Sequence, residues 1–189
     1  MQVLIAGCGD VGNVLAASLL QDGQVVYGLK RDTSTLPDGV QAIQADLTNP
    51  DTLINLPMAI DRLVFMPTPP SRDPAGYEAI FIQGWKNLWA SLKQPPVRSL
   101  LVSSTAVFGQ SDGGVVNEQT HPEPTGFNGK ILLKMEQIAT ACTEDLVVVR
   151  FSGIYGPGRE RLIRQSVSKG LEIQRFPPYF TNRIHRDDA

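Results

Sequence analysis

The stretch VLIAGCGDVGNVLAASLL, residues 3–20, decides the fold of this chain. Its first four residues are apolar and of strand length, and a glycine-rich turn follows them directly. Beyond the turn, apolar residues recur three or four positions apart, as they do on one face of a helix: Val11, Val14, Leu15 and Leu19. The stretch therefore predicts a strand, a tight turn and a helix, in that order.

The turn has the pattern G-x-G-x-x-G, which is weak by itself but specific between a strand and a helix. Gly7 allows a tight turn, Gly9 lets the backbone approach a ligand closely, and Gly12 allows the helix to pack on the strand. Free N–H groups at the start of the helix, at Asp10 and Val11, would then face an anion. The pattern predicts a site for the pyrophosphate of NAD or NADP; the alternative is that the glycines serve the turn alone.

The rest of the chain alternates between strand-length and helix-length segments. Apolar runs predict further strands at residues 24–29, 40–47, 62–66, 99–104 and 146–150. Apolar residues at helical spacing predict helices at 77–93 and 130–143. Strands that are apolar on both faces are buried between two layers of helices, so we expect an α/β fold with a doubly wound parallel sheet, the Rossmann fold. We assign residues 1–155 to this dinucleotide-binding domain and residues 156–189 to the start of a smaller substrate region.

The composition is that of an ordinary globular protein, because 42% of the 189 residues are hydrophobic, 19% are charged and the net charge is −2. Since no basic surface is expected, neither nucleic acid nor a membrane is an expected partner. The two cysteines, Cys8 and Cys142, lie far apart and have no His or Cys neighbour at the spacing of metal ligands. We expect reduced thiols, a cytoplasmic protein and no metal site.

The residues at the end of the second predicted strand determine whether such a site prefers NAD or NADP. An acidic residue there would bind the ribose hydroxyls of NAD, whereas cations would pair with the 2′-phosphate of NADP. Lys30 and Arg31 are the first residues after the predicted strand, and Asp32 lies twenty residues past Gly12. The two adjacent cations favour NADP. The alternatives are that Asp32 binds the ribose of NAD, or that the cations belong to a solvated turn.

Several further motifs resemble, in their order along the chain, the extended short-chain dehydrogenase/reductase superfamily and its NAD-dependent epimerase/dehydratase branch. The matching segments are Asp46-Leu47, the pair that contacts adenine in that family, QGWKNL with Gly84 and Asn87, SSTAVFG at 103–109, RFSGIYGPG from Arg150, and NRIHRDDA at 182–189. The resemblance implies an NAD(P)-dependent oxidoreductase, epimerase or dehydratase that acts on a sugar nucleotide or another small molecule with a hydroxyl or carbonyl group. By the same analogy, helices 77–93 and 130–143 are candidates for a homodimer interface.

The resemblance places Ser104 at the family's catalytic serine, but the helix that carries the family's Y-G-x-S-K motif departs from the pattern. Aligned on Gly129 and Glu136, this chain has Asn128 in place of the acid/base Tyr and Leu132 in place of the Lys. Asn128 does not transfer a proton at neutral pH, and Leu132 carries no charge. The pattern is similar to that of atypical members of the superfamily, which keep the glycine turn and the serine.

A proton donor for redox chemistry would then come from Ser104, from Tyr155 in GIYGPG, from Lys130 or Lys134, or from water. Lys130 and Lys134 each lie two residues from the position of the family's lysine, so the favoured interpretation is that they belong to a solvated face of the helix. We take Ser104, Asn128 and Tyr155 as the candidate catalytic residues. Two hypotheses stay open: an enzyme with a non-standard active site, supported by Ser104 and the cofactor motifs, and a catalytically silent sensor or regulatory module that binds NADP(H), supported by the departures in the helix.

The chain stops at Ala189, inside the 182–189 motif. In the family, this motif leads into further helices that line the substrate pocket. We therefore expect the C-terminal substrate region to be largely absent, and we favour a truncated chain over a protein that has lost this region.

Overall fold

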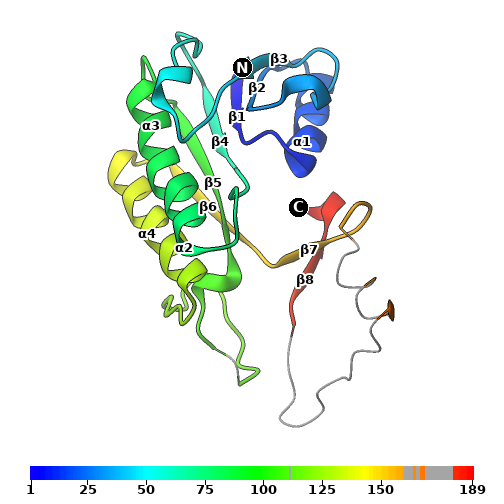
Figure 1. Ribbon diagram of the computed structural model, residues 1–189, viewed down its shortest axis with the longest axis vertical. Coiled ribbons are helices and arrows are strands. Elements are labelled where there is room, and N and C mark those ends of the chain that lie inside the picture. Colours follow the sequence, from blue (N-terminus) through cyan, green and yellow to red (C-terminus); the bar gives the residue numbers. More distant parts are fainter. Residues whose placement is uncertain (111, 160–163, 165–166, 169–180) are drawn as a thin grey trace.

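A parallel β-sheet forms the centre of the molecule (Figure 1). The computed structural model describes residues 1–110, 112–159, 164, 167–168 and 181–189. Within these residues the sheet has six strands in the order β3-β2-β1-β4-β5-β6, namely β1 (Gln2–Ala6), β2 (Val25–Lys30), β3 (Gln41–Gln44), β4 (Arg62–Phe65), β5 (Arg98–Ser104) and β6 (Leu146–Phe151). The strand order reverses between β1 and β4, and ligands of such sheets bind outside the carboxyl ends of the strands at that point.

Helices cover both faces of the sheet. On one face, α1 (Asp10–Gln21) packs against β1 and β2. The other face carries a continuous helical stretch, α2 (Pro74–Tyr77), η3 (Glu78–Gln83) and α3 (Gly84–Ser91), and beside it α4 (Phe127–Cys142) (Figure 1). The predicted doubly wound α/β fold is confirmed. In the described part of the chain, no helix is both long and apolar enough to cross a membrane.

Two apolar clusters hold the layers together. The larger cluster lies between the sheet and the helices α3 and α4, and it includes Phe65, Trp85 and Met135. The rings of Phe65 and Trp85 meet edge to face, with their centroids 5.1 Å apart. The smaller cluster lies under α1 and includes Ile5 and Ala16. Side chains of β1 alternate between the two clusters, which explains why this strand is apolar on both faces.

The second and third strands differ from their predicted lengths. β2 continues through Lys30, which pairs with Gln44 in the ladder, whereas the sequence places Lys30 just beyond the strand. β3 stops at Gln44 instead of running to residue 47. Asp46 and Leu47 consequently lie in the loop after β3, at the carboxyl edge of the sheet.

The helix predicted at residues 77–93 starts earlier and contains an irregular turn. It begins at Pro74, because the Asp73 carboxylate accepts a hydrogen bond of 2.8 Å from the N–H of Gly76 and so caps the first turn. Its middle part, η3, is π-helical, and the N–H of Gly84 donates to the carbonyl of Ala79, five residues earlier. A π-helical turn adds a residue to the helical repeat, so it changes the face that the preceding turn presents.

A second, smaller sheet brings the described end of the chain back to the region after β6. It pairs β7 (Gly153–Tyr155) with β8 (Arg183–His185) in parallel. The short turn η5 (Arg186–Asp188) follows β8 and lies against α1 (Figure 1). Much of residues 156–189 lies outside the described residues, so the division of the chain at residue 155 stays a prediction.

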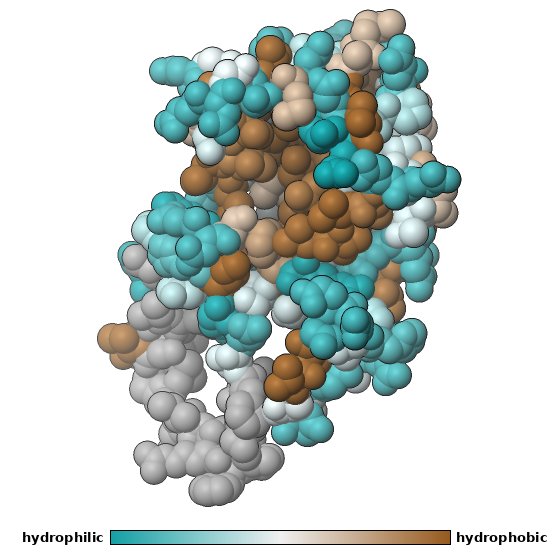
Figure 2. Space-filling view, turned by 180° about the vertical axis from the view of Figure 1, so that it is seen from behind, coloured by the Kyte–Doolittle hydropathy of each residue, from teal (hydrophilic) through white to brown (hydrophobic). Residues whose placement is uncertain are grey.

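The face of the sheet that carries α1 is only partly covered. Side chains of β5 and β6 on this face are partly exposed, and they pair across the two strands as Leu100 with Val147 and Val102 with Val149. Val147 is 41% exposed. Seen from behind, apolar side chains gather at the centre of the molecule (Figure 2). The α4 side of β5 and β6 is covered by that helix.

An ion pair joins α4 to β6 on the side of the sheet that carries the larger apolar cluster. Glu136 is 5% exposed and accepts two hydrogen bonds from Arg150, at 3.1 Å from Nε and 2.6 Å from Nη2. The guanidinium also lies over the ring of Phe108, 5.1 Å from its centroid. The hydrogen bond to Glu136 raises the pKa of Arg150 above its ordinary value. The pair thus fixes α4 on the strand that leads into β7.

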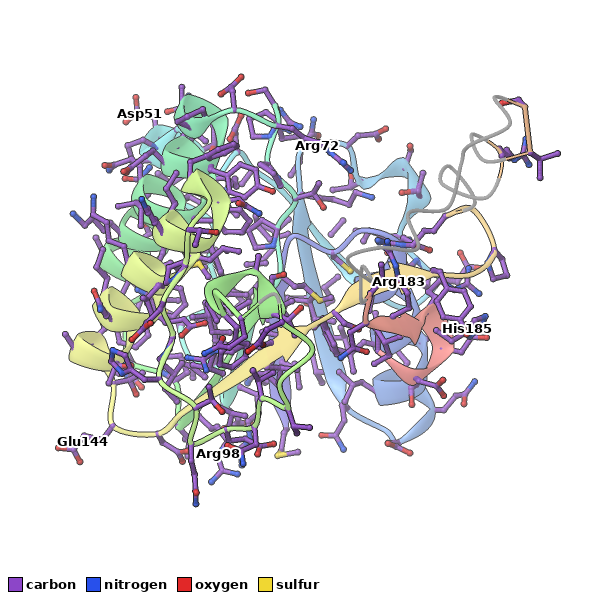
Figure 3. The ribbon with its side chains drawn as sticks, turned by 90° about the horizontal axis from the view of Figure 1, so that it is seen from below. Asp51, Arg72, Arg98, Glu144, Arg183 and His185 are labelled. Atoms are coloured by element: carbon purple, nitrogen blue, oxygen red, sulfur yellow. The ribbon has the colours of Figure 1, made fainter. Side chains whose placement is uncertain are left out.

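Replacing Glu136 with Ala should destabilise the protein by about 3 kcal/mol, because it leaves a mostly buried guanidinium without its partner. Urea denaturation of the purified protein measures this as a loss of unfolding free energy. Glu144→Ala is the matched control, since Glu144 points away from the molecule just beyond the same helix (Figure 3). Equal unfolding free energies for the two variants would contradict a structural role for the pair.

Candidate functional site

The turn after β1 has the shape that its sequence predicts. Gly7 has a φ of +89°, in the left-handed region that favours glycine. A Cβ at Gly7 would also overlap the backbone of Pro67, with the Pro67 nitrogen at only 2.6 Å. Since Pro67 follows β4 closely, this glycine is required by the close approach of two backbone turns at the point where the strand order reverses.

Gly9 lies in a different situation, because a Cβ there would meet only the carbonyl oxygen of Gly7, at 3.8 Å. The space above Gly9 is therefore open to a ligand. Gly9 precedes α1, and no side chain caps the first turn of that helix, so its backbone N–H groups remain free to bind an anion. An open glycine and an uncapped helix start together fit the pyrophosphate of a dinucleotide.

Cys8, between these two glycines, points away from the opening. Its side chain is 0% exposed, and the thiol donates to Asn13 Oδ1 at 3.5 Å. The Asn13 amide in turn donates to the carbonyl of Thr35 at 2.9 Å, which connects α1 to the turn after β2. Burial raises the pKa of the Cys8 thiol to about 11.

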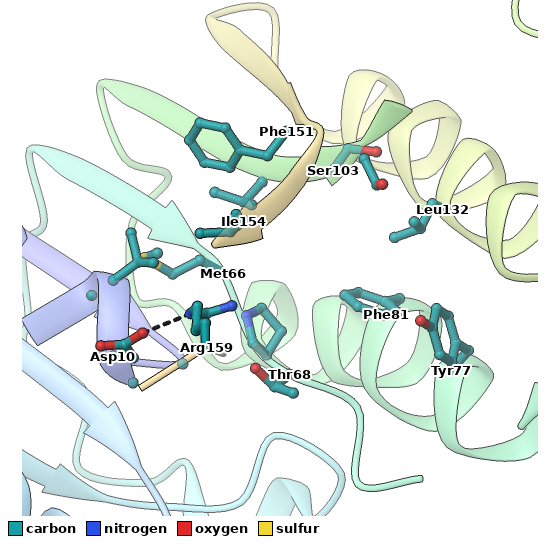
Figure 4. Close-up of a pocket in the computed structure, with 17 residues that line it drawn as sticks. Asp10, Met66, Thr68, Tyr77, Phe81, Ser103, Leu132, Phe151, Ile154 and Arg159 are labelled. Atoms are coloured by element: carbon teal, nitrogen blue, oxygen red, sulfur yellow. Dashed lines mark hydrogen bonds and ion pairs between the residues drawn. The ribbon is translucent and has the colours of Figure 1, made fainter. Parts of the chain in front are cut away.

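A cleft with two lobes runs along the carboxyl edge of the sheet on either side of this turn. The β2 lobe, about 450 Å³, is lined by residues that follow β2 and β3. The β5 lobe, about 210 Å³, is lined by the ends of β5 and β6 and by α4 (Figure 4). The two lobes share four residues: Gly7, Gly9, Pro67 and Thr68. The cleft is thus continuous across the glycine turn.

All residues predicted from the sequence to bind the cofactor line this cleft. Asp10, Val11 and Gly12 lie in the β5 lobe with the shared glycines, and the β2 lobe holds Lys30, Arg31, Asp46 and Leu47. Their common position supports the assignment, whereas the contacts of each with a cofactor stay a prediction.

In the β2 lobe, the cationic side chains of Lys30 and Arg31 differ from the neighbouring carboxylate of Asp32 in their hydrogen bonds. Arg31 is exposed, and Lys30 donates a hydrogen bond of 2.6 Å to the hydroxyl of Thr35. Asp32 instead caps the short turn η1 (Thr33–Thr35), where its carboxylate accepts from the N–H of Ser34 at 3.0 Å. Hydrogen bonds from Ser34 lower the pKa of Asp32. The Asp32 carboxylate is therefore engaged within its own loop.

The loop after β3 is held by the helical stretch that carries the QGWKNL motif. The amide of Asn87, which is buried, donates to the carbonyl of Leu47 at 2.9 Å. A Cβ at Gly84 would lie 3.2 Å from the Cβ of Leu47, so the small residue allows close packing there. The carboxylate of Asp46 accepts from the N–H and the hydroxyl of Thr48, at 2.9 and 2.8 Å. The QGWKNL motif thus supports the Asp46-Leu47 loop, and this loop forms one wall of the β2 lobe.

In the β5 lobe, the two serines at the end of β5 lie at different depths. Ser104 Oγ accepts a hydrogen bond of 3.2 Å from the N–H of Ala106 and caps the turn η4 (Thr105–Val107). Ser103 is 5% exposed, and its Oγ has no hydrogen-bond partner among the described residues. Ser103 and Leu132 lie close together in Figure 4. Both serines line the lobe, and the partly exposed Ser104 is the one whose hydroxyl can bind an oxygen atom of a ligand.

Of the two departures in α4, only one reaches the cleft. Leu132 lines the β5 lobe, as the alignment on Gly129 and Glu136 predicts, but Asn128 does not. We expected both side chains to face the lobe. Asn128 belongs to the first turn of α4, which begins at Phe127, and the lobe contacts the helix one turn later. Asn128 is thus not among the residues that line the lobe, and its approach to Ser104 stays a prediction.

Three candidate proton donors, Tyr155, Lys130 and Lys134, also lie outside both lobes. Tyr155 is 43% exposed and packs against His185, with the ring centroids 5.3 Å apart. Lys130 is exposed, and Lys134 pairs with Glu78 on the outer surface at 3.3 Å. The expectation that the lysines are solvated agrees with these positions.

Two titratable residues that line the β5 lobe had no role in the sequence analysis. Tyr77, at the end of α2, places its phenol in the β5 lobe, and Arg159 enters the same lobe from the segment after β7. Arg159 Nε donates to the carboxylate of Asp10 at 2.7 Å, and Arg186 lies 3.7 Å from the other oxygen of that carboxylate. A signal for Arg159 was present in its place directly after G-P-G, but Tyr77 had no signal beyond its helix.

The comparisons with known proteins agree with this geometry. The model of the NAD-dependent epimerase/dehydratase family matches residues 3–187. Among solved structures, a protein described as an NAD-dependent epimerase/dehydratase from Methylobacillus flagellatus is 38% identical, with a TM-score of 0.79 over 99% of this chain and 66% of that one. MoeE5 in complex with UDP-glucose and NAD is 26% identical, with a TM-score of 0.74 over 98% of this chain and 68% of that one.

UDP-glucuronic acid 4-epimerase from Bacillus cereus in complex with NAD is 23% identical, with a TM-score of 0.72 over 89% of this chain and 64% of that one, and it shares the fold. This chain thus spans less than two thirds of the length of the Methylobacillus and Bacillus proteins. Among the curated proteins, none matches this sequence significantly.

Arg159→Ala should weaken the binding of a dinucleotide about tenfold, because the guanidinium lies beside the expected pyrophosphate and offsets the charge of Asp10. Isothermal titration with NADPH measures the dissociation constant. Arg186→Ala is the control, because Arg186 approaches the same carboxylate without lining the cleft. Equal losses for the two variants would show that only the neutralisation of Asp10 matters.

Proposed function

This chain belongs to the NAD-dependent epimerase/dehydratase family, and we propose that its cleft binds NADP(H) for redox chemistry on a hydroxyl or carbonyl group of a small molecule such as a sugar nucleotide. The observation that carries the proposal is the continuous cleft with open Gly9 at its centre. Its two lobes match the two halves of a dinucleotide, with the adenosine in the β2 lobe and the nicotinamide in the β5 lobe.

The residues present fit such a cofactor. Gly7, Gly9 and Gly12, with the N–H groups of Asp10 and Val11, would hold the pyrophosphate at the start of α1. The loop of Asp46 and Leu47 would hold the adenine, and Ser104 would lie at the nicotinamide end. When bound, the nicotinamide accepts or donates a hydride.

The β2 lobe favours NADP over NAD. A carboxylate that binds both ribose hydroxyls of NAD needs free acceptor positions, and Asp32 uses its Oδ1 to cap η1, so fewer of these positions are free. Lys30 and Arg31 supply two positive charges at the same edge, where they would pair with a 2′-phosphate. The positions of these three side chains support NADP as the cofactor.

The double variant Lys30→Ala/Arg31→Ala should weaken NADPH binding about 10-fold to 100-fold and leave NADH binding unchanged, because only NADPH carries the 2′-phosphate. Dissociation constants for both cofactors come from the same titration. Lys86→Ala/Lys93→Ala removes the same charge from exposed positions outside the cleft and serves as the control. Tighter binding of NADH than of NADPH by the unmodified protein would disprove the assignment.

The β5 lobe supports catalysis through hydroxyl groups. The Ser104 hydroxyl caps η4 only as an acceptor, so its own proton remains free to bind a carbonyl or hydroxyl oxygen of a substrate. MoeE5, the relative at 26% identity, is described as a complex with UDP-glucose, and we therefore propose a sugar nucleotide as the first substrate class to test.

Ser104→Ala should lower the rate of cofactor oxidation or reduction at least ~10-fold, which is the low end for the loss of a positioned polar group. Asn128→Ala should keep most of the activity, because Asn128 does not line the lobe. The assay follows NADPH absorbance with a panel that includes UDP-glucose, UDP-glucuronic acid and their keto forms. A larger loss for Asn128→Ala than for Ser104→Ala would contradict the assignment.

A second candidate function is a sensor or regulatory module that binds NADP(H) without chemistry. It is favoured by Leu132, which puts an aliphatic group in the β5 lobe where the family has a lysine. Submicromolar binding of NADPH together with the absence of turnover across the panel would support the sensor, whereas turnover that depends on Ser104 supports the enzyme.

A further inference from the structure

We propose that Tyr77 is the acid catalyst of the β5 lobe and gives its phenolic proton to the carbonyl oxygen of a substrate during reduction. This inference rests on the proposed function, since it assigns the proton donor for the same redox step. The position of Tyr77 on α2, rather than on α4, would explain how the lobe operates without a tyrosine at residue 128.

The described residues that line the β5 lobe include three with titratable side chains: Asp10, Tyr77 and Arg159. Asp10 and Arg159 bind each other at 2.7 Å at the end of the lobe next to the glycine turn. Figure 4 shows Tyr77 at the opposite end, near Phe81 and Leu132. Among these three, Tyr77 is the one that carries a transferable proton and is not held in an ion pair.

Aromatic contacts hold the Tyr77 ring in place while its hydroxyl stays free. The ring packs against Phe81 and Phe127, with centroid distances of 5.3 and 5.5 Å. Within the described residues, the specific side-chain interactions of Tyr77 are these two ring contacts, and none is a hydrogen bond of its hydroxyl. A ring fixed on two sides by apolar groups presents its hydroxyl in one direction, which is what a proton donor to a bound substrate requires.

The same contacts place Tyr77 beside the start of α4. Phe127 is the first residue of α4 and directly precedes Asn128. The phenol therefore enters the lobe from the neighbouring helix, next to the turn that lacks a proton donor. The π-helical segment η3 begins directly after Tyr77, so the turn that carries Tyr77 is rotated relative to α3.

In the proposed step, the carbonyl carbon of the substrate receives a hydride from NADPH, while the carbonyl oxygen receives the proton of Tyr77 as the phenolic O–H bond breaks. The products are an alcohol, NADP⁺ and a tyrosine phenolate, and the phenolate recovers its proton from water. Ser104 would bind the same oxygen through its hydroxyl.

Tyr77→Phe is the direct test, because it keeps the ring and its packing and removes only the hydroxyl. We expect kcat for the reduction of a keto substrate to fall at least ~100-fold, as for loss of a general acid. The dissociation constant of NADPH should change less than ~2-fold, since the hydroxyl is not part of cofactor binding. Tyr27→Phe is the matched control, because Tyr27 lines neither lobe.

A second measurement locates Tyr77 without any substrate. Nitration with tetranitromethane, followed by peptide mass spectrometry, should modify Tyr77 in the free protein and much less in the presence of saturating NADPH. Tyr155 provides the internal comparison, because it is 43% exposed and lies outside both lobes, and its nitration should not depend on NADPH.

The outcomes separate this inference from the function on which it rests. A protein that binds neither NADPH nor NADH overturns both proposals. A protein that binds NADPH but reduces none of the panel overturns the enzyme proposal and the catalytic role of Tyr77, and leaves cofactor binding intact. Turnover that survives Tyr77→Phe, or nitration of Tyr77 that NADPH does not reduce, overturns the role of Tyr77 alone.

Discussion

The close approach of the backbone at Gly7 to the backbone at Pro67 is the constraint on which the rest of the site depends. A side chain on Gly7 would separate the turn after β1 from the turn after β4. These two turns form the floor shared by both lobes, and the strand order reverses between them. Without this contact, the start of α1 would not lie over the crevice, and the two lobes would not be continuous.

The fold could be predicted from the sequence because burial on two faces leaves a clear pattern. β1 is apolar at nearly every position since its side chains enter both clusters, and Gly7 and Gly9 mark the turn that follows. The position in the cleft of the proposed cofactor-binding residues could be predicted for the same reason, because they belong to the glycine turn and to strand ends. Asp46 and Leu47 reach the cleft although β3 is shorter than predicted.

The side chains that line the β5 lobe were harder to predict from the sequence. Whether Asn128 reaches the lobe depends on where along α4 the lobe meets the helix, and helical spacing predicts only that Asn128 and Leu132 share a side. The sequence does not predict that Tyr77 lines the lobe, because a π-helical turn has no distinct composition. The change of helix face that this turn causes is visible only in three dimensions. Contacts between helices, such as that of Tyr77 with Phe127, are likewise absent from linear spacing.

Charge at the glycine turn is balanced by groups far apart in the sequence. Asp10 lies in the first turn of α1, where a carboxylate interacts favourably with the helix dipole but would repel a pyrophosphate. Arg159 and Arg186 approach it from segments that follow β7 and β8. The affinity of the turn for an anion therefore depends on the C-terminal part of the described chain as well as on the glycines.

The buried thiol under the turn has a consequence for the chemical durability of the site. Nucleophilic attack by cysteine requires the thiolate, and the raised pKa of Cys8 keeps its sulfur protonated at neutral pH. The sulfur is also closed to solvent, whereas Cys142 is partly accessible. Peroxide or an alkylating reagent would thus modify Cys142, near the end of α4, before it reaches the turn between Gly7 and Gly9. A glycine turn with a buried cysteine at its centre can in this way stay unmodified under oxidative stress.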